Sequence, residues 1–169
     1  HAWILHLIAL GLGLSGSASG LGQSTLPGPD EVGLALDTRD GGLLLEHDAE
    51  LARWPLTVGF RVRLFSAAGY SIFVASETKA SPAHWEIFSE GGRLTLYAPG
   101  MQPDHVRTGV DLSDGAWRAI QVAMTPGRVR VAVDGEVVAD EPVRRPAELA
   151  GLREGMAFGR LVEGGLGAA

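Results

Sequence analysis

The stretch DGAWRAIQVAMTPGRVRVAVDGEVV, residues 114–138, decides the fold class of this chain. It contains two runs in which apolar residues alternate with other residues, 117–125 and 128–133, and this two-residue period is typical of strands with one buried face. Pro126-Gly127 separates the runs, and Asp134-Gly135 follows the second. Asp-Gly supplies the positive φ angles that a two-residue hairpin turn needs. The stretch therefore predicts three antiparallel strands joined by tight turns.

The same pattern continues on the N-terminal side of this stretch, where turn sequences rich in glycine separate short alternating runs. The chain contains 24 Gly and 9 Pro, and no run has the period of a long helix. We therefore predict an all-β domain. The expected strands lie near 32–37, 42–47, 56–65, 70–76, 84–89, 93–98, 106–112, 117–125, 128–133 and 136–141.

The order of these elements resembles the laminin-G-like, or concanavalin A-like lectin/glucanase, superfamily in its bacterial form. Its members carry a strand that begins with Trp, as at Trp117, followed by a Val-Asp-Gly hairpin, as at 133–135. The likeness extends upstream to the segments 55–62 and 84–94 and covers residues 31–166. The resemblance implies a two-sheet antiparallel jelly-roll sandwich, and a binding role more often than catalysis.

The resemblance also implies a last strand after residues 159–165, and the chain ends without it. We expect a sandwich that lacks this strand and that belongs to a longer chain with other domains. The open edge would expose unpaired backbone groups and favour aggregation.

The N-terminal segment differs from the rest of the chain. Residues 2–14 are almost wholly apolar, and small residues follow, among them Ser17 and Ser19. This run is shorter than the roughly 20 residues that span a bilayer, and the two serines suit a cleavage site. The sequence predicts a signal peptide over 1–20 that is incomplete at its start, a linker over 21–30 and the sandwich over 31–169. We expect export to the periplasm, the cell surface or the extracellular space.

Composition narrows the classes of partner. Apolar residues make up 46% of the chain and charged residues 20%, which excludes a disordered protein. The net charge of −6 supplies no basic field for a phosphate backbone, so no nucleic acid partner is expected. The chain has no cysteine and therefore no disulfide framework or thiol nucleophile.

The nearest approach to a glycosidase motif is the segment 86–90, Glu-Ile-Phe-Ser-Glu. On a strand, Glu86 and Glu90 share one face about 13 Å apart, at roughly 3.3 Å per residue. Glycosidase carboxyl pairs lie about 5 to 9.5 Å apart, and Phe88 occupies the position of the middle acid. The pattern indicates exposed glutamates at a strand edge. We expect no catalytic residue, and a glycoside hydrolase of the same fold stays open as an alternative.

Metal sites have weak support in the sequence. His47, His84 and His105 are the candidate ligands, and His47 and His105 each adjoin an aspartate, but adjacent residues of a strand point to opposite faces and do not chelate together. Some members of the superfamily bind calcium at a loop rim, where Asp104, Asp111 and Asp114 would be the nearest acids. No other cofactor is expected.

The best candidates for a ligand surface are Trp85 and Tyr97, which flank the hairpin at Gly91-Gly92. Aromatic rings pack on the CH-rich faces of sugars. Trp117 is expected in the core, and Trp54 at one end of the sandwich. We predict a non-catalytic recognition domain of an exported protein that binds carbohydrate or a protein surface. The alternative is a structural or docking module of a larger multidomain exported enzyme.

Overall fold

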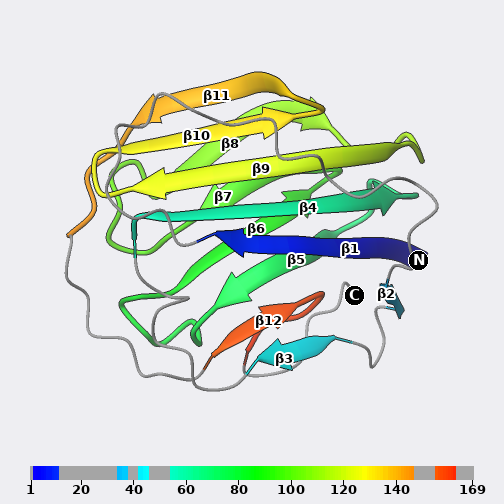
Figure 1. The fold of residues 1–169 in the computed structure, drawn as a ribbon, viewed down its shortest axis with the longest axis horizontal. Coiled ribbons are helices and arrows are strands. Elements are labelled where there is room, and N and C mark those ends of the chain that lie inside the picture. The colour runs from blue at the N-terminus through cyan, green and yellow to red at the C-terminus, as the bar shows by residue number, and fades with distance from the viewer. Residues whose placement is uncertain (1, 12–33, 38–41, 46–53, 147–154, 163–169) are drawn as a thin grey trace.

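Two antiparallel sheets of six strands each pack face to face in a computed structural model that describes residues 2–11, 34–37, 42–45, 54–146 and 155–162 (Figure 1). The first sheet has the order β11 (Glu136–Pro142), β10 (Arg128–Val133), β9 (Trp117–Thr125), β4 (Leu56–Leu64), β1 (Ala2–Gly11), β2 (Leu34–Asp37). The second has the order β3 (Leu43–Leu45), β12 (Met156–Phe158), β5 (Tyr70–Ser76), β6 (Trp85–Glu90), β7 (Arg93–Tyr97), β8 (His105–Asp111). The described residues contain no helix, so the predicted all-β jelly-roll sandwich is confirmed.

The meander over residues 114–138 is present with its predicted strands and turns. Thr125 pairs with Arg128 across Pro126-Gly127, and Val133 pairs with Glu136 across Asp134-Gly135. Asp134 and Gly135 have φ angles of 51° and 84°, the left-handed values that an Asp-Gly turn supplies. All ten predicted strands exist, and their bounds differ from the prediction by at most two residues. The sequence analysis missed two strands: β1, whose residues it assigned to a signal peptide, and β12, which has only three residues.

The main core lies between the sheets and takes side chains from both. Val58, Phe60 and Val62 of β4 are fully buried, and so are Trp85 and Ile87 of β6. Each set occupies every second position of its strand, which is the period that turns one strand face toward the other sheet. Burial of one such side chain contributes about 1.5 to 3 kcal/mol.

A second, smaller cluster packs on the outer face of the second sheet. Ile72, Ala75 and Phe88 are buried there under Leu161, which follows β12, and Tyr97 packs against them. The outer face of the second sheet therefore has an apolar patch next to polar strand residues.

The N-terminal apolar segment forms β1, which pairs with β4 on one side and with β2 on the other. Its role as a leader stays a prediction, and the predicted cleavage region and linker lie outside the described residues. The last strand expected beyond residue 169 likewise stays a prediction. Within the described part of the chain, no helix has the length and apolarity to cross a membrane.

Candidate functional site

Three side chains meet in one row across the outer face of the second sheet. Tyr97 on β7 pairs with Glu86 on β6 and with His105 on β8. Trp85, Ile87 and Leu96 belong to the main core, so the alternation of strand residues turns Glu86 and Tyr97 outward. We call the surface formed by Tyr70, Glu86, Glu90, Tyr97 and His105 the Tyr97 face.

Tyr97 is half-buried between two imidazoles. Its ring centroid lies 4.7 Å from that of His105 and 6.1 Å from that of His84. Asp104 Oδ1 lies 2.9 Å from His105 Nδ1, and this hydrogen bond is the main reason that the pKa of Asp104 lies below its usual value. The row therefore ends in a polar pair with hydrogen-bonding capacity beside an aromatic ring.

Tyr70 lies on the same face and is 42% exposed. Its ring stacks on Phe88 with centroids 5.0 Å apart, and its hydroxyl donates to Glu90 Oε1 at 3.0 Å. Burial, followed by the hydrogen bond to Glu90, raises the pKa of Tyr70. Tyr70 thus adds a second ring to the face, in a different row from Tyr97 because it pairs with Glu90.

Trp85 does not belong to this surface, which corrects the prediction that it stacks on a ligand. It is 0% exposed and lies in the main core. Glu86 is the residue that pairs with Tyr97. Trp85 precedes Glu86 on β6, so its side chain points to the opposite face of the sheet. Glu86 and Glu90 lie on the Tyr97 face of β6, but only Glu90 is exposed.

A buried polar cluster around His84 and Glu86 lies next to Tyr97. His84 Nδ1 donates to the carbonyls of Ser76 and Glu77 at 2.9 and 3.0 Å. Its Nε2 lies 3.6 Å from Glu86 Oε2, and Lys79 Nζ lies 3.7 Å from Glu86 Oε1. Glu86 is only 3% exposed, so the prediction of an exposed glutamate is wrong at this position. Its carboxylate lies near these two nitrogen atoms, beyond hydrogen-bond distance of either.

The three acids predicted to bind calcium do not form one site, because Asp104 lies at the other end of β8 from Asp111. Asp104 precedes β8, whereas Asp111 ends it. Asp111 Oδ1 accepts hydrogen bonds from the N–H and the hydroxyl of Ser113 at 2.8 and 2.6 Å, which lowers the pKa of Asp111. The described residues include no group of three or more His, Asp or Glu side chains that could hold a metal ion. Calcium binding stays a prediction, and His47 lies outside the described residues.

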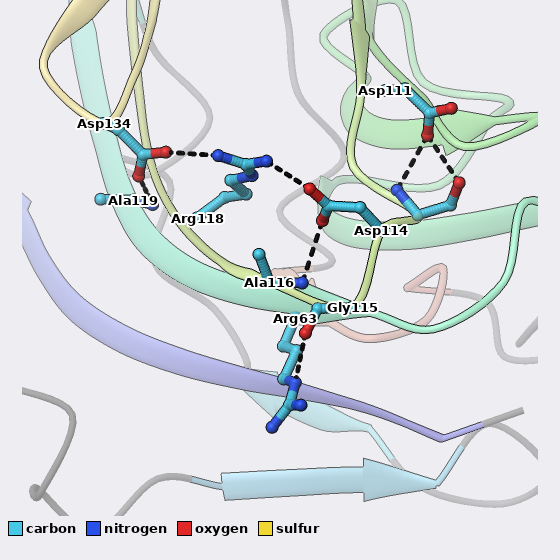
Figure 2. A network of polar contacts seen from close by, with 9 residues as sticks. Arg63, Asp111, Asp114, Gly115, Ala116, Arg118, Ala119 and Asp134 are labelled. Atoms are coloured by element: carbon cyan, nitrogen blue, oxygen red, sulfur yellow. Dashed lines mark hydrogen bonds and ion pairs between the residues drawn. The ribbon is translucent and has the colours of Figure 1, made fainter.

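An arginine links the turns at this end of the sandwich. Figure 2 shows the Arg118 guanidinium between the carboxylates of Asp114 and Asp134. Asp114 also accepts from the N–H of Ala116 at 2.9 Å, which is the largest reason that the pKa of Asp114 is lowered. Asp134 Oδ1 accepts from the N–H of Ala119 at 2.8 Å. The carboxylates of Asp114 and Asp134 therefore stabilise the turns in which they lie.

Trp117 faces outward on the first sheet, so the prediction that it lies in the core is wrong. It pairs with Arg63, while Ile120 and Val122 of the same strand are buried. The Arg61 guanidinium lies 5.7 Å from the centroid of the Trp117 ring. Trp54 is 8% exposed and packs in the main core.

The end of the sandwich opposite the Arg118 turns contains an open cavity at the surface, with a volume of about 600 Å³, that no sequence motif indicates. It lies between the β7–β8 loop, the Pro126-Gly127 turn and the segment after β11. Its lining residues are Gly100, Gln102, Pro126, Gly127, Val143, Arg144, Arg145 and Pro146.

The fold has counterparts among solved structures, although no family model matches the chain. Domains LG4-5 of the mouse laminin alpha1 chain superpose with a TM-score of 0.58 and 20% identity, covering 72% of this chain and 32% of that one. The binding domain of botulinum neurotoxin DC, solved in complex with rat synaptotagmin II, gives a TM-score of 0.54 at 12% identity, covering 70% and 32%. The chain thus spans about a third of either structure. Its fold is laminin-G-like, or concanavalin A-like, as predicted.

Proposed function

We propose that this chain is a non-catalytic recognition domain of an exported protein, and that it binds carbohydrate on the Tyr97 face. The observation that carries the proposal is the contact between the half-buried Tyr97 ring and His105, because His105 and its partner Asp104 lie at the surface and can bond hydroxyls. A pyranose can pack its CH-rich side on the Tyr97 ring while His105 and Asp104 bond its hydroxyls.

The rest of the face supports a binding role. Phe88 is buried and supports the exposed ring of Tyr70, and the outward-facing strand residues lie on a paired sheet. Groups positioned in this way lose little conformational entropy when a ligand binds. The botulinum neurotoxin DC domain of similar fold is a binding domain, and that use of the fold agrees with the proposal.

The acids of the face do not favour hydrolysis. Glu86 is buried against Lys79 and His84, whereas Glu90 is exposed and bonded to Tyr70. Phe88 lies between them on β6. Glycoside hydrolysis needs two carboxyl groups on either side of one glycosidic bond, so we place recognition ahead of catalysis.

The test is retention on an array of neutral and acidic oligosaccharides, with and without calcium. We expect wild-type protein to bind at least one glycan, and Tyr97→Ala to bind it at least tenfold more weakly, because stacking residues dominate such sites. Phe65→Ala is the matched control, since Phe65 is an exposed aromatic residue (47%) on another part of the surface. Both variants should keep the far-UV circular dichroism of the wild type.

Two results would contradict the proposal. If Tyr97→Ala binds as well as the wild type, the ligand lies elsewhere on the domain. If the wild type binds no glycan but captures a purified domain of the same longer chain, the domain is a docking module, the alternative that the sequence left open.

A further inference from the structure

Tyr70 presents an open aromatic surface on the Tyr97 face. Its ring is nearly parallel to that of Phe88, with an interplanar angle of 16° and centroids 5.0 Å apart. Phe88 is only 1% exposed, whereas Tyr70 is 42% exposed. Because the buried phenylalanine covers one side of the tyrosine ring, the other side is available to solvent. Aromatic surfaces of this kind pack on the CH-rich faces of sugars.

A polar contact holds the Tyr70 ring in place beside an acceptor. The hydroxyl donates to Glu90 Oε1 at 3.0 Å across the β5–β6 pair, and Glu90 is exposed. A carboxylate has two oxygens with several lone pairs, so Glu90 can also accept hydrogen bonds from the hydroxyl groups of a ligand. A ring that is already fixed loses little conformational entropy when a ligand packs on it. Tyr70 and Glu90 therefore have the composition of a sugar subsite.

Tyr70 and Tyr97 are too far apart to stack on the same sugar. Tyr70 pairs with Glu90, and Tyr97 pairs with the residue four positions earlier on β6. Four residues extend a strand by about 13 Å, and the step from β5 to β7 crosses two strand spacings of about 4.8 Å, so the two Cα atoms lie roughly 16 Å apart. Each ring also has its own aromatic partner, Phe88 for Tyr70 and His105 for Tyr97. A ligand that contacts both tyrosines is therefore a chain of sugars.

Arg107 lies between the rows of the two tyrosines. It pairs with Thr95 on β7, and Thr95 pairs with Phe88 on β6, which is midway between the partners of Tyr70 and Tyr97. The preceding residue of β8 is buried in the main core, so the alternation of the strand directs Arg107 to the outer face, where it is exposed. A guanidinium carries five N–H donors. A chain that extends from one tyrosine to the other therefore passes a strong donor.

We propose that the Tyr97 face binds a linear oligosaccharide, with Tyr97 and Tyr70 stacking on different sugar residues and Arg107 donating to the hydroxyl groups between them. This inference rests on the proposed function, because it extends the same site. It assigns the substrate class as a stretch of a polysaccharide chain, not a single terminal sugar. Tyr70 determines the preference for longer chains, because a monosaccharide on Tyr97 does not reach it.

The probes are linear cello-, xylo-, manno- and chito-oligosaccharides of one to six residues, and the same size series of any other glycan that the array identifies. NMR titration gives the affinity of each probe. We expect the affinity of the wild type to rise on the order of tenfold between one residue and four, and then to level off. Tyr70→Ala should remove this rise without changing the affinity for the monosaccharide. Tyr70→Phe keeps the ring and should preserve the rise.

Arg107→Gln is a second variant that does not depend on the packing of Tyr70. Arg107 is exposed, so its loss leaves the core intact. We expect this variant to weaken the binding of chains of four or more residues on the order of tenfold, the effect of one charge-assisted contact, and to bind the monosaccharide as the wild type does. Phe65→Ala is the matched aromatic control, and its affinities should equal those of the wild type at every length.

The outcomes distinguish this inference from the proposed function. If no probe binds, or if Tyr97→Ala binds every chain as the wild type does, the proposed function fails and the inference fails with it. If Tyr97→Ala loses binding but the wild type binds one residue and six with equal affinity, the inference alone is overturned. Equal affinities of Tyr70→Ala and Tyr70→Phe for the long chains would also overturn it, because the ring of Tyr70 would then contribute nothing.

Discussion

The Arg145 guanidinium lies over the Trp54 indole, with Cζ 4.3 Å from the ring centroid. The contact joins the segment after β11 to the residue that precedes β4 by one proline. The same guanidinium donates to the carbonyls of Ala83 and His84, just before β6. One side chain therefore connects both sheets at the end of the sandwich that contains the cavity.

Arg145→Lys should destabilise the fold, because an ammonium cannot reproduce the planar contact with Trp54 and both carbonyl bonds. We expect the free energy of unfolding to fall by about 2 kcal/mol, the range for hydrogen bonds to charged groups. Urea denaturation measures it. Arg144→Lys, at the exposed neighbour, should change stability by less than about 0.5 kcal/mol. Equal stabilities of the two variants would show that the buried contacts contribute nothing.

Trp85 lies in the core and Trp117 on an outer face of a sheet, so their truncation should destabilise the fold to different extents. Trp85→Ala removes a fully buried ring from the main core and should cost about 3 to 5 kcal/mol. Trp117→Ala removes a half-buried ring from an outer face and should cost less by about 2 kcal/mol. Chemical denaturation of both variants gives the comparison. A larger loss for Trp117→Ala would contradict the assignment of faces.

Gly91 and Gly92 form a matched pair at the β6–β7 turn. Both have positive φ angles, 57° and 81°, where a side chain is strained. A Cβ on Gly91 would meet open space, whereas one on Gly92 would lie 2.8 Å from Asp111 Oδ1. We expect Gly91→Ala to cost about 1 kcal/mol, and Gly92→Ala to cost clearly more, because it also displaces the acceptor of Ser113. Thermal denaturation measures the difference. Equal melting temperatures of the two variants would contradict this expectation.

Asp140 should make stability depend on pH in acid. It accepts hydrogen bonds from Arg128 Nε at 2.5 Å and Arg130 Nη2 at 2.9 Å, and these hold the pKa of its carboxyl well below the usual range. A group whose pKa is lower in the folded state stabilises the fold above its unfolded pKa, about 4, and this contribution disappears as the pH falls through the folded value.

The test compares the melting temperatures of Asp140→Asn and the wild type from pH 7 to pH 2. The variant should melt lower at pH 7, and the two curves should converge toward pH 2. Glu141→Gln, an exposed acid on the same strand, serves as the control. A constant difference between Asp140→Asn and the wild type over this range would show that the charge of Asp140 plays no part.

The structure separates the two residues that the sequence predicted to bind a ligand, Trp85 and Tyr97. Both residues flank the hairpin at Gly91-Gly92, but only Tyr97 faces outward. On β6, one face carries Trp85 and Ile87 and the other carries Phe88 between two glutamates. Both faces contain large apolar side chains, so periodicity alone does not identify the one that meets the other sheet. The buried state of Glu86 also depends on Lys79 and His84, which approach it through the tertiary fold.

By itself, the sequence determined the all-β class, the ten predicted strands, the turns between them and the likeness to laminin-G-like domains. These features depend on local chemistry, because alternation and Gly-containing turns act within a few residues. The tertiary structure decided which strand faces form the core, the short strand β12, and the burial of Arg145 over the Trp54 ring. Those features arise where segments distant in sequence pack together, and no local pattern specifies such contacts.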